Sequence, residues 1–185
     1  MENQLANRFL IAMPSLADPN FSRTVTYLCD HNAEGAMGLV INRPLELSLA
    51  DLAPHVEVEV TDAARADTPI YQGGPVQAER GFVLHRPTGD WEATLDITED
   101  IGLTMSRDII EAIAQGEGPR DHLIALGYAG WGAGQLEAEL AANAWLSGPA
   151  DHGILFELPI GRRWEAAAAL LGVDLTLLST DIGHA

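Results

Sequence analysis

The sequence contains no lysine, and all ten of its basic residues are arginines. Chemistry that needs a lysine amine is therefore excluded: a phosphate-loop lysine, a Schiff base with a carbonyl substrate and a pyridoxal phosphate linkage. No other pattern in the chain indicates a bound cofactor, so we predict a protein that carries none.

Cysteine is almost as scarce, since Cys29 is the only one in the chain. One cysteine cannot form an internal disulfide, a CxxC redox pair or a site with several thiolate ligands. The six histidines lack the spacing of metal ligands, and neither an HExxH nor a GxSxG motif occurs. We therefore predict a reducing compartment, no metal site and no recognisable catalytic motif.

Long apolar segments are absent as well. No run approaches the ~20 residues that a membrane-spanning helix needs. The N-terminal segment carries Glu2 ahead of a short apolar stretch, residues 9–13, which Pro14 ends. Because this segment lacks the basic start and the length of a signal peptide, we expect a cytoplasmic protein without a membrane partner.

Positive charge is scarce relative to negative charge. Ten basic residues stand against 27 acidic ones, which gives a formal net charge of −17 at pH 7. Long-range forces from such a chain repel nucleic acid phosphates and anionic lipids. We therefore predict no direct nucleic acid binding, and a partner that is either another protein or a small anionic ligand.

What the chain does contain is enough apolar residues for one core. Its 185 residues with 47% hydrophobic content predict a single domain over residues 1–185. Short apolar runs predict strands, and apolar residues three or four apart predict helices, with Ser106 a favourable helix N-cap. The expected strands are 9–13, 24–29, 36–41, 70–72, 81–85, 91–97, 122–128 and 154–158, and the expected helices are 48–53, 106–116, 135–143 and 162–171. The fold class that follows is mixed α/β or α+β.

The strands 24–29 and 36–41 are separated by a polar turn and predict an antiparallel hairpin. Pairing Cys29 with Ala36, with Pro44 ending the second strand, brings Arg23 level with Asn42 and Arg43 at the open end. A bulge at Gly38 is the one feature expected to disturb this register.

This register makes Arg23, Thr24, Asn42 and Arg43 a candidate anion-binding site, because guanidinium groups bind carboxylates and phosphates through paired hydrogen bonds. The competing interpretation is that both arginines form internal ion pairs, with Asp18 or Glu46 as partners. The site would serve a small enzyme that acts on an anionic metabolite, or a protein that only binds one.

A second candidate site is the glycine-rich segment Gly130, Trp131, Gly132, Gly134 and Gln135, expected as a turn between a strand and a helix. A dinucleotide site needs glycine or alanine where Gln135 stands, and Trp131 is bulky where backbone should approach a pyrophosphate. A tight turn with Trp131 packed on the core is the favoured interpretation. A small anion at the helix N-terminus is the alternative.

Cys29 is the only soft nucleophile, and His31 lies close in sequence, so a reactive thiol is a third candidate. On a period of two, however, Cys29 shares a strand face with Val25 and Tyr27, which indicates a core position. The neighbouring charge of Asp30 opposes ionisation of the thiol. A packed, structural cysteine is therefore the favoured interpretation.

Five segments carry a family resemblance: FLIAMPSLADPNFSRTVTYLCDHNAEGAMGLVINRP, PIYQGGPV, RGFVLH, LGYAGWGAGQLEAEL and a terminal GHA. In this order they resemble the AlgH/YqgE family of uncharacterised bacterial proteins, over essentially the whole chain. The resemblance implies a cytosolic single domain with a mixed, bifurcated sheet and a small barrel surrounded by helices. Members are often labelled transcriptional regulators, and no catalytic residue is implied. With the charge argument, this favours a non-enzymatic regulatory or binding protein that acts on transcription indirectly.

Overall fold

The computed structural model describes residues 5–178. In that range the strands are β1 (Arg8–Ala12), β2 (Val25–Asn32), β3 (Gly35–Val40), β4 (Pro44–Ser48), β5 (Pro69–Gln72), β6 (Val76–Arg86), β7 (Thr94–Asp96), β8 (Gly102–Thr104), β9 (Asp121–Gly132) and β10 (Trp145–Pro149). The α-helices are α1 (Leu49–Leu52), α2 (Arg107–Ala114), α3 (Gln135–Ala141), α4 (His152–Phe156) and α5 (Arg163–Ala169). Short 3-10 helices occupy Ala53–Val56, Ala63–Arg65 and Ile160–Arg162. No helix within this range is long and apolar enough to cross a membrane.

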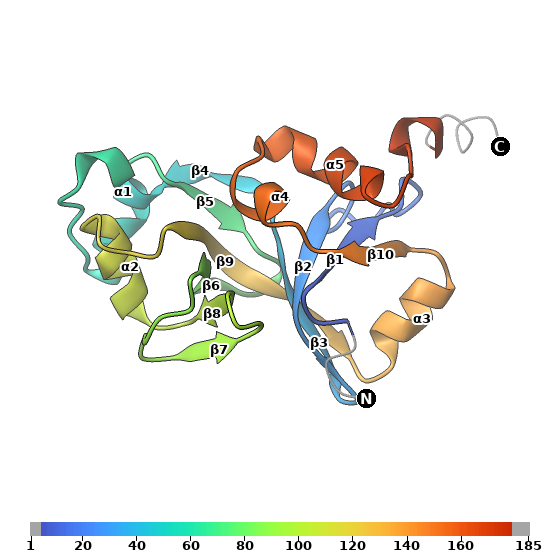
Figure 1. Ribbon diagram of the computed structural model, residues 1–185, viewed down its shortest axis with the longest axis horizontal. Coiled ribbons are helices and arrows are strands. Elements are labelled where there is room, and N and C mark those ends of the chain that lie inside the picture. The colour runs from blue at the N-terminus through green and yellow to red at the C-terminus, as the bar shows by residue number, and fades with distance from the viewer. Residues whose placement is uncertain (1–4, 179–185) are drawn as a thin grey trace.

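All ten strands belong to one mixed sheet that divides along β9 (Figure 1). The main path is β10-β1-β2-β3-β9-β6-β8-β7, with antiparallel neighbours. The first part of β9 lies between β6 and the parallel strand β5, with Ile70 opposite Ile124. The last part pairs with β3, from Ala129 opposite Gly38 onward. The sheet thus bifurcates and curls into a half-barrel.

The branch depends on a close approach between the β5–β6 connection and β9. The amide of Gly73 donates to the carbonyl of Leu126, and its carbonyl accepts from the amide of Val40 in β3, both at 2.8 Å. At Gly74, which has φ of +158°, a Cβ atom would lie 2.1 Å from the backbone carbon of Tyr128. A side chain at this position would therefore collide with β9, so glycine is required here.

The helices form three groups around the sheet, and each group covers one cluster of the hydrophobic core (Figure 1). Helices α4 and α5 pack on the largest cluster, α1 and α2 on a second, and α3 on a third. Their central buried members are Phe9, Tyr27, Leu39, Leu155 and Trp164 in the first, Leu49, Ile70, Ile109, Ile113 and Ile124 in the second, and Leu10, Leu28, Trp131, Leu136 and Trp145 in the third.

Several sequence predictions for the fold are confirmed. The mixed, bifurcated sheet implied by the family resemblance is present, and its half-barrel corresponds to the expected small barrel. Helix α1 begins at a capping box formed by Ser48 and Asp51. Helix α2 follows Ser106 and buries Ile109 and Ile113. These are the segments in which local caps and apolar spacing agree with the tertiary packing.

One strand prediction is wrong. Residues 154–158 were expected as a strand, but residues 154–156 belong to helix α4. The N-cap of α4 is Asp151, whose carboxylate accepts a hydrogen bond from the amide of Ile154 at 3.0 Å. That cap outweighs the strand propensity of a short apolar run. Pro44 lies beyond the end of β3 at Val40, as expected for a residue that stops this strand, and it also begins β4, opposite Tyr71 of β5. Proline is tolerated as the first residue of a strand because no ladder amide is needed there.

Candidate functional site

The β2–β3 hairpin has a different register from the one expected. Ala36 lies opposite His31, not opposite Cys29, because β2 continues to Asn32 and the turn is shorter than predicted. The pairing also shifts by one residue at Cys29, which forms a bulge in β2 across from Gly38. The bulge was expected in β3, and the register near the open end, with Thr26 opposite Val40, differs by one residue from the expected one.

Arg23, Thr24, Asn42 and Arg43 do lie together at that open end, but their polar groups bind backbone. The Asn42 carboxamide accepts from the amide of Val25 and donates to the carbonyl of Arg23, each at 2.9 Å. The Thr24 hydroxyl donates to a loop carbonyl at 2.6 Å. The Arg43 guanidinium donates to two further carbonyls of residues 19–22, at 2.6 and 2.9 Å. These contacts fix the loop between β1 and β2.

The Arg23 guanidinium lies over the Trp164 ring, with Cζ 5.3 Å from the ring centroid, in a cation–π contact. Within residues 5–178, neither Asp18 nor Glu46 forms an ion pair with Arg23 or Arg43. Neither arginine lines a cavity described below. Their observed contacts support loop anchoring, and anion binding at this end of the hairpin stays a prediction.

The glycine-rich segment is mostly strand, contrary to the expected turn. Gly130, Trp131 and Gly132 end β9, and only the following residues turn, with Gly134 at φ +74° as the N-cap of α3. The Gln135 side chain folds back and accepts from the Gly132 amide at 2.9 Å. Its carboxamide thus occupies the start of α3, which is seven residues long. This arrangement gives no support to a nucleotide site.

Trp131 packs on the core, as the favoured interpretation predicted. Its ring stacks on Phe21 at 6.1 Å and meets Trp145 edge to face at 6.0 Å. The indole N–H groups of Trp131 and Trp145 both donate to one carboxylate oxygen of Glu139, at 3.1 and 2.9 Å. One carboxylate on α3 therefore satisfies two indole donors and locks the helix onto the sheet.

Cys29 is buried, with 3% of its surface exposed, in the same core cluster as Val25 and Tyr27. Its Sγ lies 3.7 Å from the carbonyl oxygen of Tyr27. Burial, and secondly the charge of Asp30, raise the pKa of the Cys29 thiol far above its usual range. The thiolate that a nucleophile or redox sensor needs is therefore disfavoured.

We predict that a thiol reagent such as 5,5′-dithiobis(2-nitrobenzoate) modifies native Cys29 at least about a hundredfold more slowly than a model thiol at neutral pH. The reagent reaches the buried thiol poorly, and the raised pKa of the thiol leaves little of the reactive thiolate. The release of thionitrobenzoate measures the rate, and the same protein in denaturant supplies the control, because there the single thiol must react completely. Native labelling as fast as in denaturant would show an accessible thiol and contradict the prediction.

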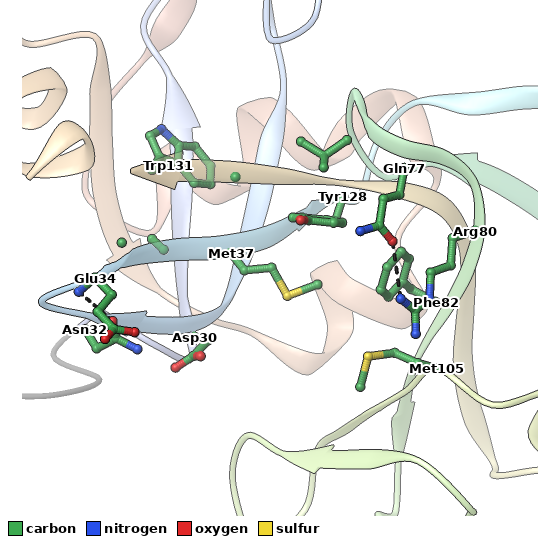
Figure 2. Close-up of a pocket in the computed structure, with 14 residues that line it drawn as sticks. Asp30, Asn32, Glu34, Met37, Gln77, Arg80, Phe82, Met105, Tyr128 and Trp131 are labelled. Carbon is green, nitrogen blue, oxygen red and sulfur yellow. Dashed lines mark hydrogen bonds between the residues drawn. The ribbon is translucent and has the colours of Figure 1, made fainter. Parts of the chain in front are cut away.

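A groove of about 570 Å³ opens between the β2–β3 hairpin and β6, beside the branch of the sheet. Figure 2 shows Met37 of the hairpin, Tyr128 of β9, Phe82 of β6 and Met105 around one common space. The Phe82 and Tyr128 rings meet edge to face at 5.5 Å. The groove therefore has a floor of aromatic rings and thioethers, a surface that accepts flat or flexible apolar groups.

One wall of the groove is made by an excursion of β6. Residues 77–80 of β6 face a single β9 residue, Gly127, because pairing runs from Val76 opposite Tyr128 directly to Gly81 opposite Leu126. Gln77 takes a left-handed conformation with φ of +48°. The excursion takes residues 77–80 out of the β6–β9 pairing and places Gln77 and Arg80 in the lining of the groove.

Arg80 ends this excursion and points over the groove floor (Figure 2). Its Cζ lies 5.7 Å from the centroid of the Phe82 ring, and Nη1 donates to the Gln77 carboxamide at 3.3 Å. No carboxylate of the described residues forms an ion pair with it. In a chain with 27 acidic residues, an arginine that stacks on the groove floor keeps most of its donors for a ligand.

The opposite wall carries the other sign of charge. Asp30, Asn32 and Glu34 line it from the hairpin (Figure 2). Asn32 caps the turn by accepting from the Glu34 amide at 2.8 Å. An anionic group is repelled by this wall and attracted to Arg80, so the groove has a polarity along which an anion would be oriented.

Buried histidines outside the groove have structural partners. His85 is fully buried, and its Nδ1 lies 2.9 Å from the carbonyl oxygen of Pro87, so Nδ1 carries the proton. Nε2 then accepts from the Thr104 hydroxyl at 2.6 Å. Burial lowers the pKa of His85, which keeps the ring neutral. No group of three or more metal-ligating side chains is arranged around an ion site in residues 5–178.

Sequence reasoning missed this groove because its residues come from strands far apart in the chain. Met37, Phe82 and Tyr128 each stand in an ordinary apolar run. The local signal that was available is Arg80, a basic residue directly before an apolar strand in a chain with few basic residues. Its stacking on Phe82 depends on the β6 excursion, which has no marker in the sequence.

The fold and the site define a class of protein: a single domain with a bifurcated, half-barrel sheet and an open groove beside the branch of that sheet. The chain belongs to the AlgH-like family, whose pattern matches residues 9–176. It is 58% identical to a UPF0301 protein of Thioalkalivibrio sulfidiphilus, over 99% of this chain and 98% of that protein. It is also 58% identical to a UPF0301 protein of Nitrosococcus oceani, over 97% of this chain and 96% of that protein.

Two solved structures share the fold. The solution structure of AlgH from Pseudomonas aeruginosa matches with a TM-score of 0.81 and 54% identity, covering 96% of this chain and 94% of that one. The crystal structure of a Corynebacterium diphtheriae protein matches with a TM-score of 0.74 and 17% identity, covering 96% of this chain and 92% of that one. The second match, at low identity, shows a common fold and nothing more.

Proposed function

We propose that this protein binds an amphipathic organic anion in the groove between the β2–β3 hairpin and β6, and carries out no chemistry on it. The observation that carries the proposal is Arg80, held over the Phe82 ring without a carboxylate partner among the described residues. The ligand's carboxylate or phosphate group binds the guanidinium, and its apolar body covers the groove floor.

The dimensions of the groove support a small ligand. About 570 Å³ lies within the range of pockets that hold metabolites and drug-sized molecules. The edges of Met37 and Met105 adapt to different apolar shapes because thioether side chains are flexible. Repulsion by Asp30 and Glu34 orients the ligand with its anionic end toward Arg80.

The alternative proposal, a small enzyme acting through Arg23 and Arg43, has weaker support. Arg43 is engaged by two backbone carbonyls and Arg23 by Trp164. Cys29, the soft nucleophile, is buried with a raised pKa. Catalysis requires a reactive group within hydrogen-bonding reach of the substrate, and the Thr24 and Asn42 side chains beside this arginine pair are instead hydrogen-bonded to backbone.

We propose that ligand binding in the groove serves a regulatory role. The net charge of −17 favours control through a protein partner or the ligand itself rather than through contact with DNA. A cytoplasmic location belongs to the same proposal, since the single cysteine is buried and unpaired.

The test is a titration with 2-naphthoate, indole-3-acetate and decanoate, three acids that differ in the shape of their apolar body. We expect saturable binding by isothermal titration calorimetry, and at least about tenfold weaker binding of the same acids to Arg80→Gln, because a charge-assisted hydrogen bond is lost.

Arg107→Gln is the matched control, since Arg107 is an exposed arginine outside the groove that pairs with Glu111 at 3.9 Å. It should bind these acids as the wild-type protein does. A neutral analogue, 2-naphthylmethanol, should bind more weakly than 2-naphthoate and should not distinguish Arg80→Gln from the wild type. Equal binding of the acids to both arginine variants, or no binding of any acid, would overturn the proposal.

A further inference from the structure

A second cavity, of about 200 Å³, lies at the other end of β9 and concentrates the scarce positive charge of this protein. It is bounded by β5, the start of β9, α4 and the first residue of α5. Its polar lining consists of Arg65, Thr68, Tyr71, His122 and Arg163, and no carboxylate from residues 5–178 lines it. In a chain with ten basic and 27 acidic residues, two arginines beside a histidine make an unusual local balance.

Arg163 is a buried cation without a counter-ion in the described part of the chain. It is 4% exposed, its Nε donates to the carbonyl of Leu158 at 2.9 Å, and its Nη1 donates to the carbonyl of Ile41 at 2.7 Å. Its Cζ lies 5.4 Å from the centroid of the Tyr71 ring. These contacts lock the guanidinium and leave Nη2 without a hydrogen bond to any residue from 5 to 178. Burying an unpaired charge is costly, and a bound anion would offset the cost.

The other polar groups of the cavity also keep unused capacity. Arg65 reaches Asp62 only through Nε at 3.7 Å, which is beyond hydrogen-bonding distance and leaves its Nη groups available. The Tyr71 side chain is 4% exposed, and its hydroxyl has no hydrogen bond with a described residue. Asp121, the nearest acidic neighbour in sequence, pairs instead with Arg86 and Arg120, at 4.0 and 3.9 Å.

His122 presents a hydrogen-bond acceptor to the cavity, so a ligand that satisfies it must carry a proton to donate. Its Nδ1 lies 3.2 Å from the carbonyl oxygen of Pro119, which can only accept, so Nδ1 carries the ring proton. Burial lowers the pKa of His122, and the charge of Arg65 lowers it further, so the ring stays neutral. Nε2 is then an acceptor in a cavity that Arg65 and Arg163 also line. An oxyanion that carries one O–H group satisfies both kinds of partner, whereas sulfate has no proton to donate.

We propose that this cavity binds a protonated phosphate oxyanion, either free phosphate or the phosphate group of a small monoester. Arg163 Nη2 and Arg65 bind the charged oxygens, the Tyr71 hydroxyl donates a further hydrogen bond, and His122 Nε2 accepts from the P–OH group. The proposal is independent of the groove, because the two cavities share no lining residue.

The test follows the arginine side-chain N–H resonances of ¹⁵N-labelled protein during titration with sodium phosphate at constant ionic strength. Arg163 is suited to this measurement because its Nε–H is buried and hydrogen-bonded. We expect saturable shifts for Arg163 and Arg65, and at least about tenfold weaker binding of phosphate to Arg65→Gln. Arg163 is left unaltered, since its substitution would also remove two hydrogen bonds that hold the fold.

The same titration with other variants and other anions defines the ligand. Arg80→Gln should bind phosphate as the wild type does, which separates this site from the groove. Sulfate should bind at least about tenfold more weakly than phosphate to the wild type, and His122→Phe should lose this preference. If methyl phosphate binds more tightly than inorganic phosphate, the ligand is a phosphate monoester. If methyl phosphate binds more weakly, the ligand is the free phosphate ion. No saturable shift of Arg163, equal phosphate affinity of Arg65→Gln and wild type, or equal affinity for sulfate would overturn the proposal.

Discussion

Replacing Gly74 with alanine is expected to lower the free energy of unfolding by about 3 kcal/mol or more. A Cβ at this position would lie 2.1, 2.2 and 2.3 Å from backbone atoms of Tyr128 and Ala129. Backbone of a central strand cannot move aside without disturbing its ladder, so the branch of the sheet itself must shift. For a chain of this size the melting temperature should fall by roughly 6–12 °C.

Differential scanning calorimetry measures this effect, and Gly161→Ala is the matched control. A Cβ atom at Gly161 would have open space within 4 Å, so alanine is accommodated there and the melting temperature should stay within about 2 °C of the wild type. A Gly74→Ala protein as stable as Gly161→Ala would mean that the β5–β6 connection does not cross β9 at contact distance. The placement of the groove beside that crossing would then be wrong.

Replacing Trp164 with alanine is expected to cost about 3–5 kcal/mol of stability. Trp164 is 7% exposed in the largest core cluster, and its indole N–H donates to the carbonyl of Ala12 at 2.9 Å. It is also the surface on which the Arg23 guanidinium lies. The substitution therefore leaves a cavity, an unsatisfied carbonyl of β1 and a displaced arginine at once.

Denaturation in urea with Trp164→Ala, Trp164→Phe and Leu170→Ala separates these contributions. Phenylalanine keeps an aromatic ring but loses the hydrogen bond to Ala12, so an intermediate loss of about 1–3 kcal/mol is expected. Leu170 follows the same helix and is 46% exposed, and its substitution should cost no more than about 0.5 kcal/mol. If Trp164→Ala were no less stable than Leu170→Ala, α5 would not be docked through Trp164.

The fold could be predicted from the sequence where local signals coincide with tertiary packing. Ser48 and Ser106 mark helix starts, and the apolar spacing of α2 matches the face that it buries. The hairpin register could not be predicted, because no residue pattern marks the bulge at Cys29. The same period of two is compatible with several registers, and tertiary pairing selects one of them.

The sites show the same limit. The arginine pair of the hairpin was a reasonable candidate from sequence, yet its donors bind nearby backbone that a register diagram does not contain. Arg80 and Arg163 have no motif around them, and each acquires its significance from residues far away in the chain. Arg80 meets the groove through the β6 excursion, and Arg163 of α5 meets Tyr71 of β5. Long-range packing of this kind is what local patterns omit.

The central claim, ligand binding in the groove, is tested most directly by methyl NMR of protein labelled with ¹³C at the methionine methyl groups. The chain has four methionines, and Met37 and Met105 line the groove whereas Met13 does not. Titration with 2-naphthoate should shift the Met37 and Met105 methyl signals in a saturable way, through the ring current of the bound aromatic, and leave Met13 unchanged. In Arg80→Gln the same shifts should require at least about tenfold more ligand. Shifts at Met13 alone, or none at Met37 and Met105, would contradict the account.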